Sequence, residues 1–220
     1  MPKKKLVHFQ ENLTFPHLFQ PSYAEIASGF SLFSKWGSDF FFNSNPIVLE
    51  LGCGKGEYTV GLAGRYPLIN FIGIDLKGAR LWRGARTVQE KSMKNVAFIR
   101  TRVDQINNLF CPGEIAEIWI TFPDPQKGKE RKRLTAPVFL NRYHKILNIN
   151  GLIHLKTDDE GLYNYTMGIL ADYGHTVLYH TTDLYNSDCC DDVVSIRTFY
   201  ENKWLEEGKK ICYIRFKLNF

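Results

Sequence analysis

The chain has 220 residues, a formal net charge of +5, 44% hydrophobic residues and 23% charged residues. This composition is ordinary for a folded globular protein and excludes a disordered or fibrous chain. The five cysteines are an odd number without a C-x-x-C pair, which argues against a disulfide framework and a zinc site, so we expect no bound metal. The chain begins without an apolar leader and has no run near the ~18 apolar residues of a membrane helix, so we expect a cytoplasmic protein.

In chain order, residues 1–45 are aromatic and irregular, and we expect them to form an arm packed on a domain that spans 46–220. Short β-rich runs then alternate with longer helical ones. Strands are expected at 47–51, 71–75, 96–101, 115–122, 151–156 and 176–180, and a final run at 211–220 can close the sheet as an antiparallel strand. Helices are expected at 58–66, 79–91, 137–147 and 160–173, with a short turn at 105–110. This βαβα alternation predicts one doubly wound, Rossmann-like α/β domain with a mostly parallel sheet.

The first expected strand ends in an acid and breaks into three alternate glycines, Leu49-Glu-Leu-Gly-Cys-Gly-Lys-Gly56. Glycine allows a positive φ and lets a ligand approach the backbone. The spacing is not the G-x-G-x-x-G of dinucleotide sites, where a pyrophosphate binds at a helix N-terminus. Glu50 would repel a pyrophosphate but suits the sulfonium and ammonium of S-adenosylmethionine. We therefore interpret Glu50, Gly52, Gly54 and Gly56 as a binding site for that cofactor, although the pattern also fits an ordinary tight turn.

Three more acids follow expected strands. Asp75 ends the second strand, Asp104 follows the third and Asp124 follows the fourth. Rossmann-type sheets bind ligands at the carboxyl ends of their strands. Asp75 would accept hydrogen bonds from ribose hydroxyls, and Asp104 would lie near the adenine amino group. Each acid alone could cap a loop or helix. Together with Glu50, however, they place four acids at the ends of successive strands, and this pattern predicts the cofactor site.

Asp124 lies in Phe122-Pro-Asp-Pro125, where the two prolines fix φ and remove two backbone donors. We therefore expect a stiff loop that holds this carboxylate at the reactive end of the cofactor. A basic run with a single acid, Glu130, begins two residues later. Such a run attracts a phosphate backbone, although it can also be a solvated loop. The combination favours a methyltransferase that acts on a nucleic-acid base. The basic residues are Lys127, Lys129, Arg131, Lys132 and Arg133.

Further motifs follow in order: Lys132-Arg-Leu-Thr135, Leu155-Lys-Thr-Asp158, Thr198-Phe-Tyr-Glu201 and Lys203-Trp-Leu-Glu-Glu-Gly-Lys209. Together with the stretches above, the chain from 47 to 216 resembles the bacterial tRNA (guanine-N7-)-methyltransferase family. The glycine motif is common to most class I methyltransferases, whereas the combination of Phe-Pro-Asp-Pro, Lys-Thr-Asp and Thr-x-Tyr-Glu is far more specific.

The resemblance implies S-adenosylmethionine as donor, a guanine in the tRNA variable loop as acceptor, and a monomer or homodimer with no obligate protein partner. It implies Glu50, Asp75, Asp104 and Asp124 as cofactor contacts, with Asp124 also catalytic. It further implies substrate contacts at Asp158, Thr198, Phe199, Tyr200 and Glu201, and at a lysine after Phe-Pro-Asp-Pro, for which Lys127 and Lys129 are candidates. The chain departs from the family pattern at Gln126, where tryptophan is usual, and in a basic loop that is shorter by about two residues.

Guanine N7 has an in-plane lone pair and needs no deprotonation, so positioning can supply much of the catalysis. A fixed carboxylate at Asp124 would stabilise the positive charge that develops on the base. Three alternatives remain open from the sequence. One is an amino-methyltransferase acting on another acceptor, although Phe-Pro-Asp-Pro lacks the second consecutive proline and the aromatic residue of that motif. The others are a non-catalytic RNA-binding module on the same fold and a nicotinamide oxidoreductase, which the glycine spacing and Glu50 disfavour.

Overall fold

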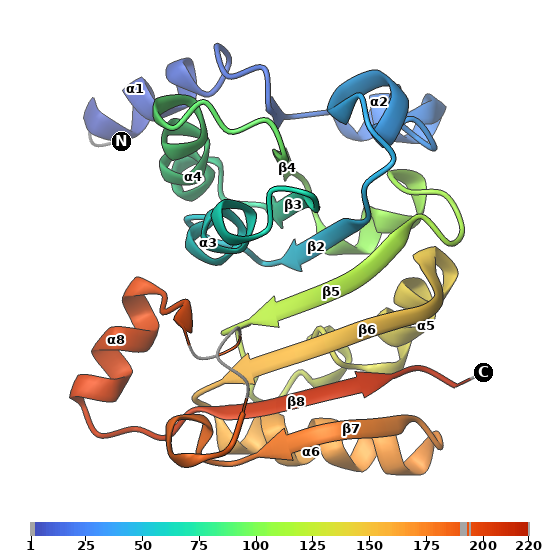
Figure 1. The fold of residues 1–220 in the computed structure, drawn as a ribbon, viewed down its shortest axis with the longest axis vertical. Helices are drawn as coiled ribbons and strands as arrows, with labels where there is room; N and C mark the ends of the chain where they lie inside the picture. Colours follow the sequence, from blue (N-terminus) through green and yellow to red (C-terminus); the bar gives the residue numbers. More distant parts are fainter. Residues whose placement is uncertain (1–2, 190–192, 194, 220) are drawn as a thin grey trace.

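A computed structural model describes residues 3–189, 193 and 195–219, and at its centre lies an eight-stranded sheet with the order β1-β4-β3-β2-β5-β6-β8-β7 (Figure 1). Strands β1 to β6 pair in parallel, whereas β8 is antiparallel to β6 and β7. This topology confirms the expected doubly wound fold with an antiparallel C-terminal strand. The strands are β1 (Leu18–Phe19), β2 (Ile47–Leu51), β3 (Asn70–Asp75), β4 (Val96–Arg100), β5 (Ile115–Thr121), β6 (Leu147–Thr157), β7 (Thr176–Thr181) and β8 (Cys212–Lys217).

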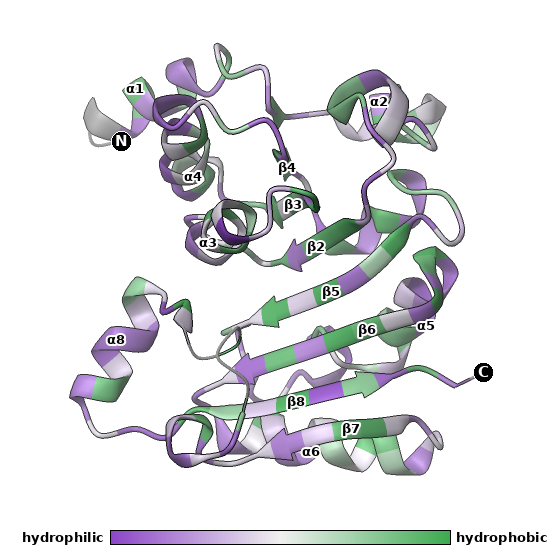
Figure 2. Ribbon diagram, viewed as in Figure 1, coloured by the Kyte–Doolittle hydropathy of each residue, from purple (hydrophilic) through white to green (hydrophobic). Residues whose placement is uncertain are grey.

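Helices cover both faces of the sheet. Helices α3 (Glu57–Arg65) and α4 (Gly78–Glu90) pack on one face, and α5 (Pro137–Ile146) and α6 (Glu160–Asp172) pack on the other. Helix α8 (Phe199–Glu206) lies beside the carboxyl ends of β5 and β6 (Figure 1) and is largely hydrophilic (Figure 2). The remaining helical segments are α1 (Lys3–Glu11), α2 (Tyr23–Gly29), a π-helix (Trp36–Phe41) and short 3-10 helices at Val103–Asn108, Glu130–Lys132 and Leu184–Asn186.

The expected strands from 47 onwards are confirmed, with shifted ends. Strand β5 stops one residue early because Phe122 takes a left-handed backbone conformation. Strand β6 begins four residues earlier than expected, since Leu147 already pairs with Ile115, while the next three residues are exposed, Ile149 among them, and so do not mark a buried strand. The last strand ends at Lys217, and the expected end at residue 220 lies outside the described residues.

The expectation that the first ~40 residues are irregular is wrong, because they contain α1, β1, α2 and the π-helix. Ser22 and Glu25 form a capping box that starts α2, a local signal readable in the sequence. Strand β1 pairs with the outer edge of β4. Trp36 is fully buried, and its indole Nε1 donates to the carbonyl of Leu109 at 3.1 Å. This segment therefore contributes a strand to the sheet and a large aromatic ring to the core.

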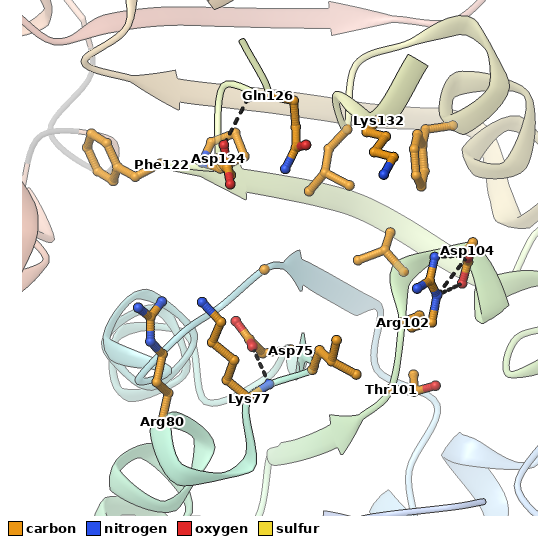
Figure 3. A pocket seen from close by; sticks show the side chains of 16 residues that line it. Asp75, Lys77, Arg80, Thr101, Arg102, Asp104, Phe122, Asp124, Gln126 and Lys132 are labelled. Carbon is orange, nitrogen blue, oxygen red and sulfur yellow. Dashed lines mark hydrogen bonds and ion pairs between the residues drawn. The ribbon is translucent and has the colours of Figure 1, made fainter. Parts of the chain in front are cut away.

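The parallel strands bring their carboxyl ends to one edge of the sheet, and the strand order reverses between β2 and β5. Such a reversal leaves a crevice in which Rossmann-type sheets bind ligands. Figure 3 shows the result: Asp75 and Lys77 lie on one side of a cleft, while Phe122, Asp124 and Gln126 lie on the facing side.

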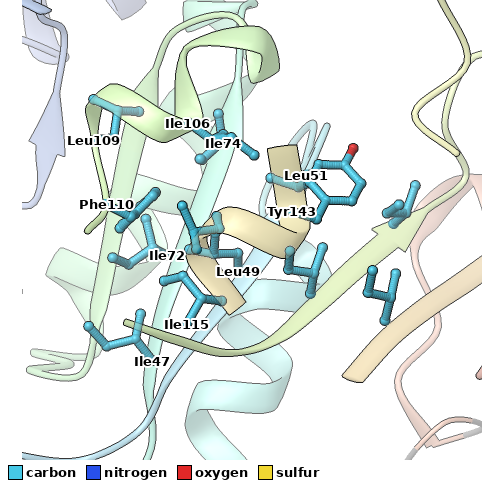
Figure 4. Close-up of a cluster of buried hydrophobic side chains, with 14 of the residues drawn as sticks. Ile47, Leu49, Leu51, Ile72, Ile74, Ile106, Leu109, Phe110, Ile115 and Tyr143 are labelled. Carbon is cyan, nitrogen blue, oxygen red and sulfur yellow. The ribbon is translucent and has the colours of Figure 1, made fainter. Parts of the chain in front are cut away.

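A buried cluster of aliphatic and aromatic side chains holds these strands in place on the α5 and α6 face of the sheet (Figure 4). Leu49, Leu51, Ile72 and Ile74 are all fully buried, and Tyr143 of α5 packs in the same cluster. Burial of one such aliphatic side chain contributes about 1.5–3 kcal/mol. Since Leu49 and Leu51 flank Glu50 and Ile74 precedes Asp75, the core fixes where the acids at the ends of β2 and β3 can lie.

Candidate functional site

The glycine turn after β2 adopts the conformation that its sequence predicts. Gly52, Gly54 and Gly56 all have positive φ, at 75°, 58° and 68°. A Cβ on Gly56 would lie 2.5 Å from the ring of Phe98, so both backbone and packing require glycine there. A Cβ on Gly54 would meet no atom within 4 Å, and this residue lines a cavity. The turn thus presents open backbone to the cleft and leads into α3.

Glu50 is buried beneath this turn with 4% of its surface exposed. Its carboxylate accepts hydrogen bonds from the Thr59 backbone N–H at 2.8 Å and from the hydroxyls of Thr59 and Thr121. Desolvation raises the pKa of Glu50 to about 7, although the threonine hydrogen bonds act to lower it. The carboxyl group is therefore poised to change its charge near neutral pH. The two threonines that hold it belong to no motif that is recognisable in the sequence.

Asp75 ties the end of β3 to the glycine turn. One carboxylate oxygen accepts from the Gly54 N–H at 2.9 Å and the other from the Lys77 N–H at 2.7 Å. Asp104 instead pairs with Arg102, whose guanidinium donates to both carboxylate oxygens at 2.9–3.2 Å. Desolvation raises the pKa of Asp104, but the hydrogen bonds and charge of Arg102 outweigh it, so the net shift is downward.

Two adjacent cavities occupy the cleft. The larger, of about 360 Å³, is lined by Asp75, Asp104 and Asp124. The smaller, of about 70 Å³, is lined by Glu50 and Gly54 and reaches α8. They share three lining residues, Gly52, Arg80 and Phe122. The structure thus brings together all the residues proposed as cofactor contacts except Gly56, which packs behind the turn. It adds Arg80 and Arg102, which no sequence motif marks.

The Phe-Pro-Asp-Pro loop is held at both ends. Phe122, its first residue, and Gln126, which follows it, have φ of 48° and 50°, in the left-handed region that non-glycine residues rarely adopt. The Phe122 N–H donates to the Lys156 carbonyl at 2.8 Å, and Arg133 Nε donates to the Pro125 carbonyl at 3.0 Å. Asp124 is exposed to the cleft and accepts from the Gln126 N–H at 3.0 Å. Such strain persists only where surrounding contacts enforce it, and it is typical of functional loops.

The basic segment divides into two kinds of residue. Lys127, Lys129, Arg131 and Lys132 are exposed, and Lys132 lines the larger cavity. Arg133 differs, because its side chain is only 11% exposed. Its guanidinium lies 4.2 Å from the centre of the Tyr165 ring and 3.5 Å from Glu130, besides its bond to the Pro125 carbonyl. Arg133 therefore braces the Asp124 loop.

Helix α8 begins with a capping box between Thr198 and Glu201. Phe199 and Tyr200 in its first turn are 55% and 42% exposed, and Thr198 and Tyr200 line the smaller cavity. Lys55 Nζ lies 4.1 Å from the centre of the Phe199 ring, which ties α8 to the glycine turn. The start of α8 is therefore a set of exposed aromatic rings at the edge of the cleft.

Two residues expected to contact substrate have partners within the protein. Glu201 is fully buried and pairs with Lys156. Asp158 is half-buried, lies 3.6 Å from Lys209 and lines neither cavity of the cleft. Desolvation raises the pKa of Asp158.

Among the described residues, no group of three His, Cys, Asp or Glu side chains could hold a metal ion. In the same part of the chain, no helix is both long enough and apolar enough to cross a membrane.

Comparisons with known proteins agree with this geometry. A family model described as "Putative methyltransferase" matches residues 44–214. A tRNA (guanine-N(7)-)-methyltransferase of Christiangramia forsetii is 53% identical over 98% of both chains. One of Porphyromonas gingivalis is 53% identical over 93% of this chain and 86% of its own, and one of Bacillus subtilis is 35% identical over 80% and 82%. Among solved structures, a 16S rRNA methyltransferase superposes with a TM-score of 0.67 at 10% identity, covering 85% of this chain and 94% of its own, which shows a shared fold.

Proposed function

Because this chain belongs to the tRNA (guanine-N(7)-)-methyltransferase family, we propose that its cleft holds S-adenosylmethionine and a guanine from the variable loop of a tRNA for transfer of a methyl group to N7. The observation that carries this proposal is the exposed carboxylate of Asp124, held on a strained loop that faces the glycine turn and Asp75 across the cleft (Figure 3). The relatives favour this reaction over an amino-methyltransferase or a non-catalytic RNA-binding module.

The residues that follow β2, β3 and β4 line one side of the cleft and fit S-adenosylmethionine. Gly52 and Gly54 leave backbone open toward the cavity, so a ligand can lie against the turn without meeting a Cβ. Asp75 and Asp104 line the larger cavity, where they would accept hydrogen bonds from the ribose and adenine groups. Glu50 lines the smaller cavity, where its negative charge would lie close to the cationic methionine portion. When bound, the cofactor supplies an electrophilic methyl group on its sulfonium.

The Asp124 loop and the start of α8, on the other side of the cleft, would position the base. Thr198 and Tyr200 line the smaller cavity, and the exposed rings of Phe199 and Tyr200 offer a flat surface on which a base can stack. Asp124 lies beside the same cleft, where its carboxylate would stabilise the positive charge that forms on a guanine alkylated at N7. The N7 lone pair needs no general base, so we propose that Asp124 orients the base and stabilises charge.

The exposed cations of the basic segment would hold the tRNA backbone. Lys127, Lys129, Arg131 and Lys132 project from the loop that follows Asp124. Contacts of lysine and arginine with phosphates supply affinity that depends on salt but not on base sequence. Of these residues, Lys132 also lines the larger cavity, and Lys127 lies 3.5 Å from Asp159.

Methyl transfer from labelled S-adenosylmethionine to unmodified tRNA tests this function. Borohydride and aniline treatment would then map the product, because N7-methylguanine is cleaved under these conditions. We expect cleavage at a variable-loop guanine, and no cleavage with Asp124→Ala. Binding of S-adenosylhomocysteine to that variant, measured by calorimetry, serves as the folding control. Methylation at an exocyclic amine, or none with a protein that binds the cofactor, would contradict the proposal.

A further inference from the structure

Lys156 is the lysine of the Leu155-Lys-Thr-Asp158 motif, and the proposed chemistry does not use it. Its side chain is 0% exposed, and so is that of Glu201, its partner in α8. The Lys156 Nζ lies 2.8 Å from Glu201 Oε1 and donates to the Val193 carbonyl at 3.0 Å. The Tyr185 hydroxyl donates to the same carboxylate oxygen at 2.6 Å. A buried ion pair with further hydrogen-bonding partners thus connects β6, the segment around Tyr185, and α8.

Stability alone is a poor explanation for this pair. Desolvation lowers the pKa of Lys156, and the charge and hydrogen bond of Glu201 only partly oppose that effect. Buried ion pairs are often no more stabilising than apolar side chains of the same volume, because desolvation offsets their attraction. What such a pair does provide is a defined geometry, since each charge has few alternative partners in the interior.

On one side, Lys156 is joined to the loop that carries Asp124. Its carbonyl oxygen accepts the hydrogen bond of the Phe122 N–H at 2.8 Å, where the strained loop begins. Its ammonium lies 5.9 Å from the centre of the Phe122 ring. The Trp204 ring of α8 also packs against Phe122, with the two ring centres 4.9 Å apart. The main chain of Lys156 therefore binds the start of the Asp124 loop, and its side chain lies near the Phe122 ring.

On the other side, Lys156 fixes the beginning of α8 through Glu201. While Oε1 of Glu201 binds Lys156 and Tyr185, its Oε2 accepts from the Thr198 N–H at 3.2 Å. The Glu201 N–H in turn donates to the Thr198 hydroxyl at 3.2 Å. The residues between the two ends of this capping box are Phe199 and Tyr200, whose rings are exposed at the cleft. A single buried carboxylate thus links the Lys156 ammonium to the backbone that carries both aromatic rings.

We propose that Lys156 is a positioning residue, which sets the aromatic start of α8 against the Asp124 loop through its buried pair with Glu201, so that a base on Phe199 and Tyr200 meets the carboxylate of Asp124. This inference rests on the proposed action on tRNA. Glu201 then acts on the substrate through the helix that it anchors. Tyr185, which also donates to Glu201, helps to hold α8 in the same position.

The test is the double variant Lys156→Met/Glu201→Gln. It removes both charges together, and the introduced glutamine keeps an oxygen for the helix cap, since glutamine also serves at this position of a capping box. We expect S-adenosylhomocysteine affinity within about twofold of the parent and a tRNA KM raised by about tenfold or more, because small misplacements at a site cost up to about 10²-fold. Amide exchange in α8 should accelerate at least tenfold, while exchange in α3 and β5 stays unchanged.

Two readouts separate positioning from a loss of folded protein. Fewer folded molecules would lower kcat at an unchanged tRNA KM, whereas a misplaced α8 raises KM for tRNA far more than KM for S-adenosylmethionine. The matched control is Lys203→Met/Glu207→Gln, which removes an exposed ion pair of 3.7 Å at the end of α8, together with the pairing of Glu207 with Lys209, and should behave as the parent. Parental tRNA KM and α8 exchange in the buried-pair variant would overturn the proposal.

A second variant decides the matter if the double variant does not fold. Tyr185→Phe removes only the hydroxyl that donates to Glu201, and we expect a tRNA KM raised by about two- to fivefold with the same selective exchange in α8. A parental value in both readouts would overturn the proposal. If the parent protein binds S-adenosylhomocysteine but methylates no tRNA, the proposed function fails, while the exchange comparison still decides whether Lys156 positions α8.

Discussion

The two halves of the cleft are built in different ways. In the half formed by β2 and β3, both acids accept hydrogen bonds from nearby backbone N–H groups: Glu50 from Thr59, and Asp75 from Gly54 and Lys77. Glu50 also accepts from the hydroxyls of Thr59 and Thr121. In the half formed by the Asp124 loop and α8, side chains hold the backbone across long sequence separations. The Phe199 N–H, for example, donates to the Glu57 carboxylate 142 residues away.

This difference predicts how each half responds to substitution. Where the backbone itself forms the site, a change acts through φ, ψ and steric fit. Where distant side chains hold the site, a change acts through the loss of a brace and leaves the local chain free to move.

The largest effect is expected for Asp124→Asn, which keeps the side-chain shape and removes its charge. We expect the single-turnover rate of methyl transfer to fall about 10²–10³-fold, as for loss of one preorganised electrostatic contact to a transition state. Rapid-quench measurement with labelled S-adenosylmethionine and saturating tRNA gives this rate. The dissociation constant of S-adenosylhomocysteine should change far less. A parental single-turnover rate would show that Asp124 has no electrostatic role.

Next comes Gly56→Ala, which tests the backbone-built half. The added Cβ would have to sit at a φ of 68° and 2.5 Å from the Phe98 ring. Strain and overpacking together should lower the free energy of unfolding by about 3 kcal/mol, which urea unfolding can measure. The control is Gly64→Ala in the helix that follows, where a Cβ meets no atom within 4 Å and should raise the free energy of unfolding by up to about 1 kcal/mol. Equal effects at the two glycines would contradict this view of the turn.

The third prediction concerns the pH dependence that Glu50 confers. Burial raises its pKa from 4.5 to about 7, and a bound cation would favour the ionised form. Binding of S-adenosylmethionine should therefore be about tenfold weaker at pH 6 than at pH 8, because at pH 6 the carboxyl must first lose its proton. Calorimetric titration at both values measures this ratio, which should vanish in Glu50→Gln.

The same shift has a defined sign in the unliganded protein. Between pH 4.5 and about 7 the folded state binds the Glu50 proton more tightly than the unfolded chain does. The contribution of Glu50 to the free energy of unfolding therefore falls as the pH rises through this window. A Glu50→Gln variant that shows the parental pH dependence in both experiments would exclude Glu50 as the titrating group.

The smallest effects are expected in the basic segment. There, the kind of effect should distinguish residues that bind phosphate from Arg133, which braces the Asp124 loop. Lys129→Ala or Arg131→Ala should weaken tRNA binding by a few-fold and lower the slope of log K against log salt by about 1 each. Arg133→Ala should leave that slope unchanged and lower the single-turnover rate instead, because Arg133 braces the Pro125 carbonyl. Filter binding at several salt concentrations gives the slopes. An equal change of slope for Arg133→Ala would mean that Arg133 contacts phosphate directly.

Much of the fold follows from local pattern. The alternating runs from residue 47 onwards predict the strands and helices because each apolar run has to be buried on a sheet or helix face. Local pattern does not predict the N-terminal segment, since its structure depends on contacts far away in sequence: β1 pairs with β4, and Trp36 donates to Leu109. The capping box of Ser22 and Glu25 is a local signal in this segment.

The candidate site divides in the same way. The amino-acid sequence by itself determined the glycine turn and the acids at the strand ends, because positive φ and strand register are local properties that a few neighbouring residues specify. Only the tertiary structure decided that Arg133 braces the Asp124 loop and that Glu201 is buried against Lys156. The sequence alone does not show whether a charged side chain faces solvent or pairs with a distant residue, because that depends on how the folded chain packs.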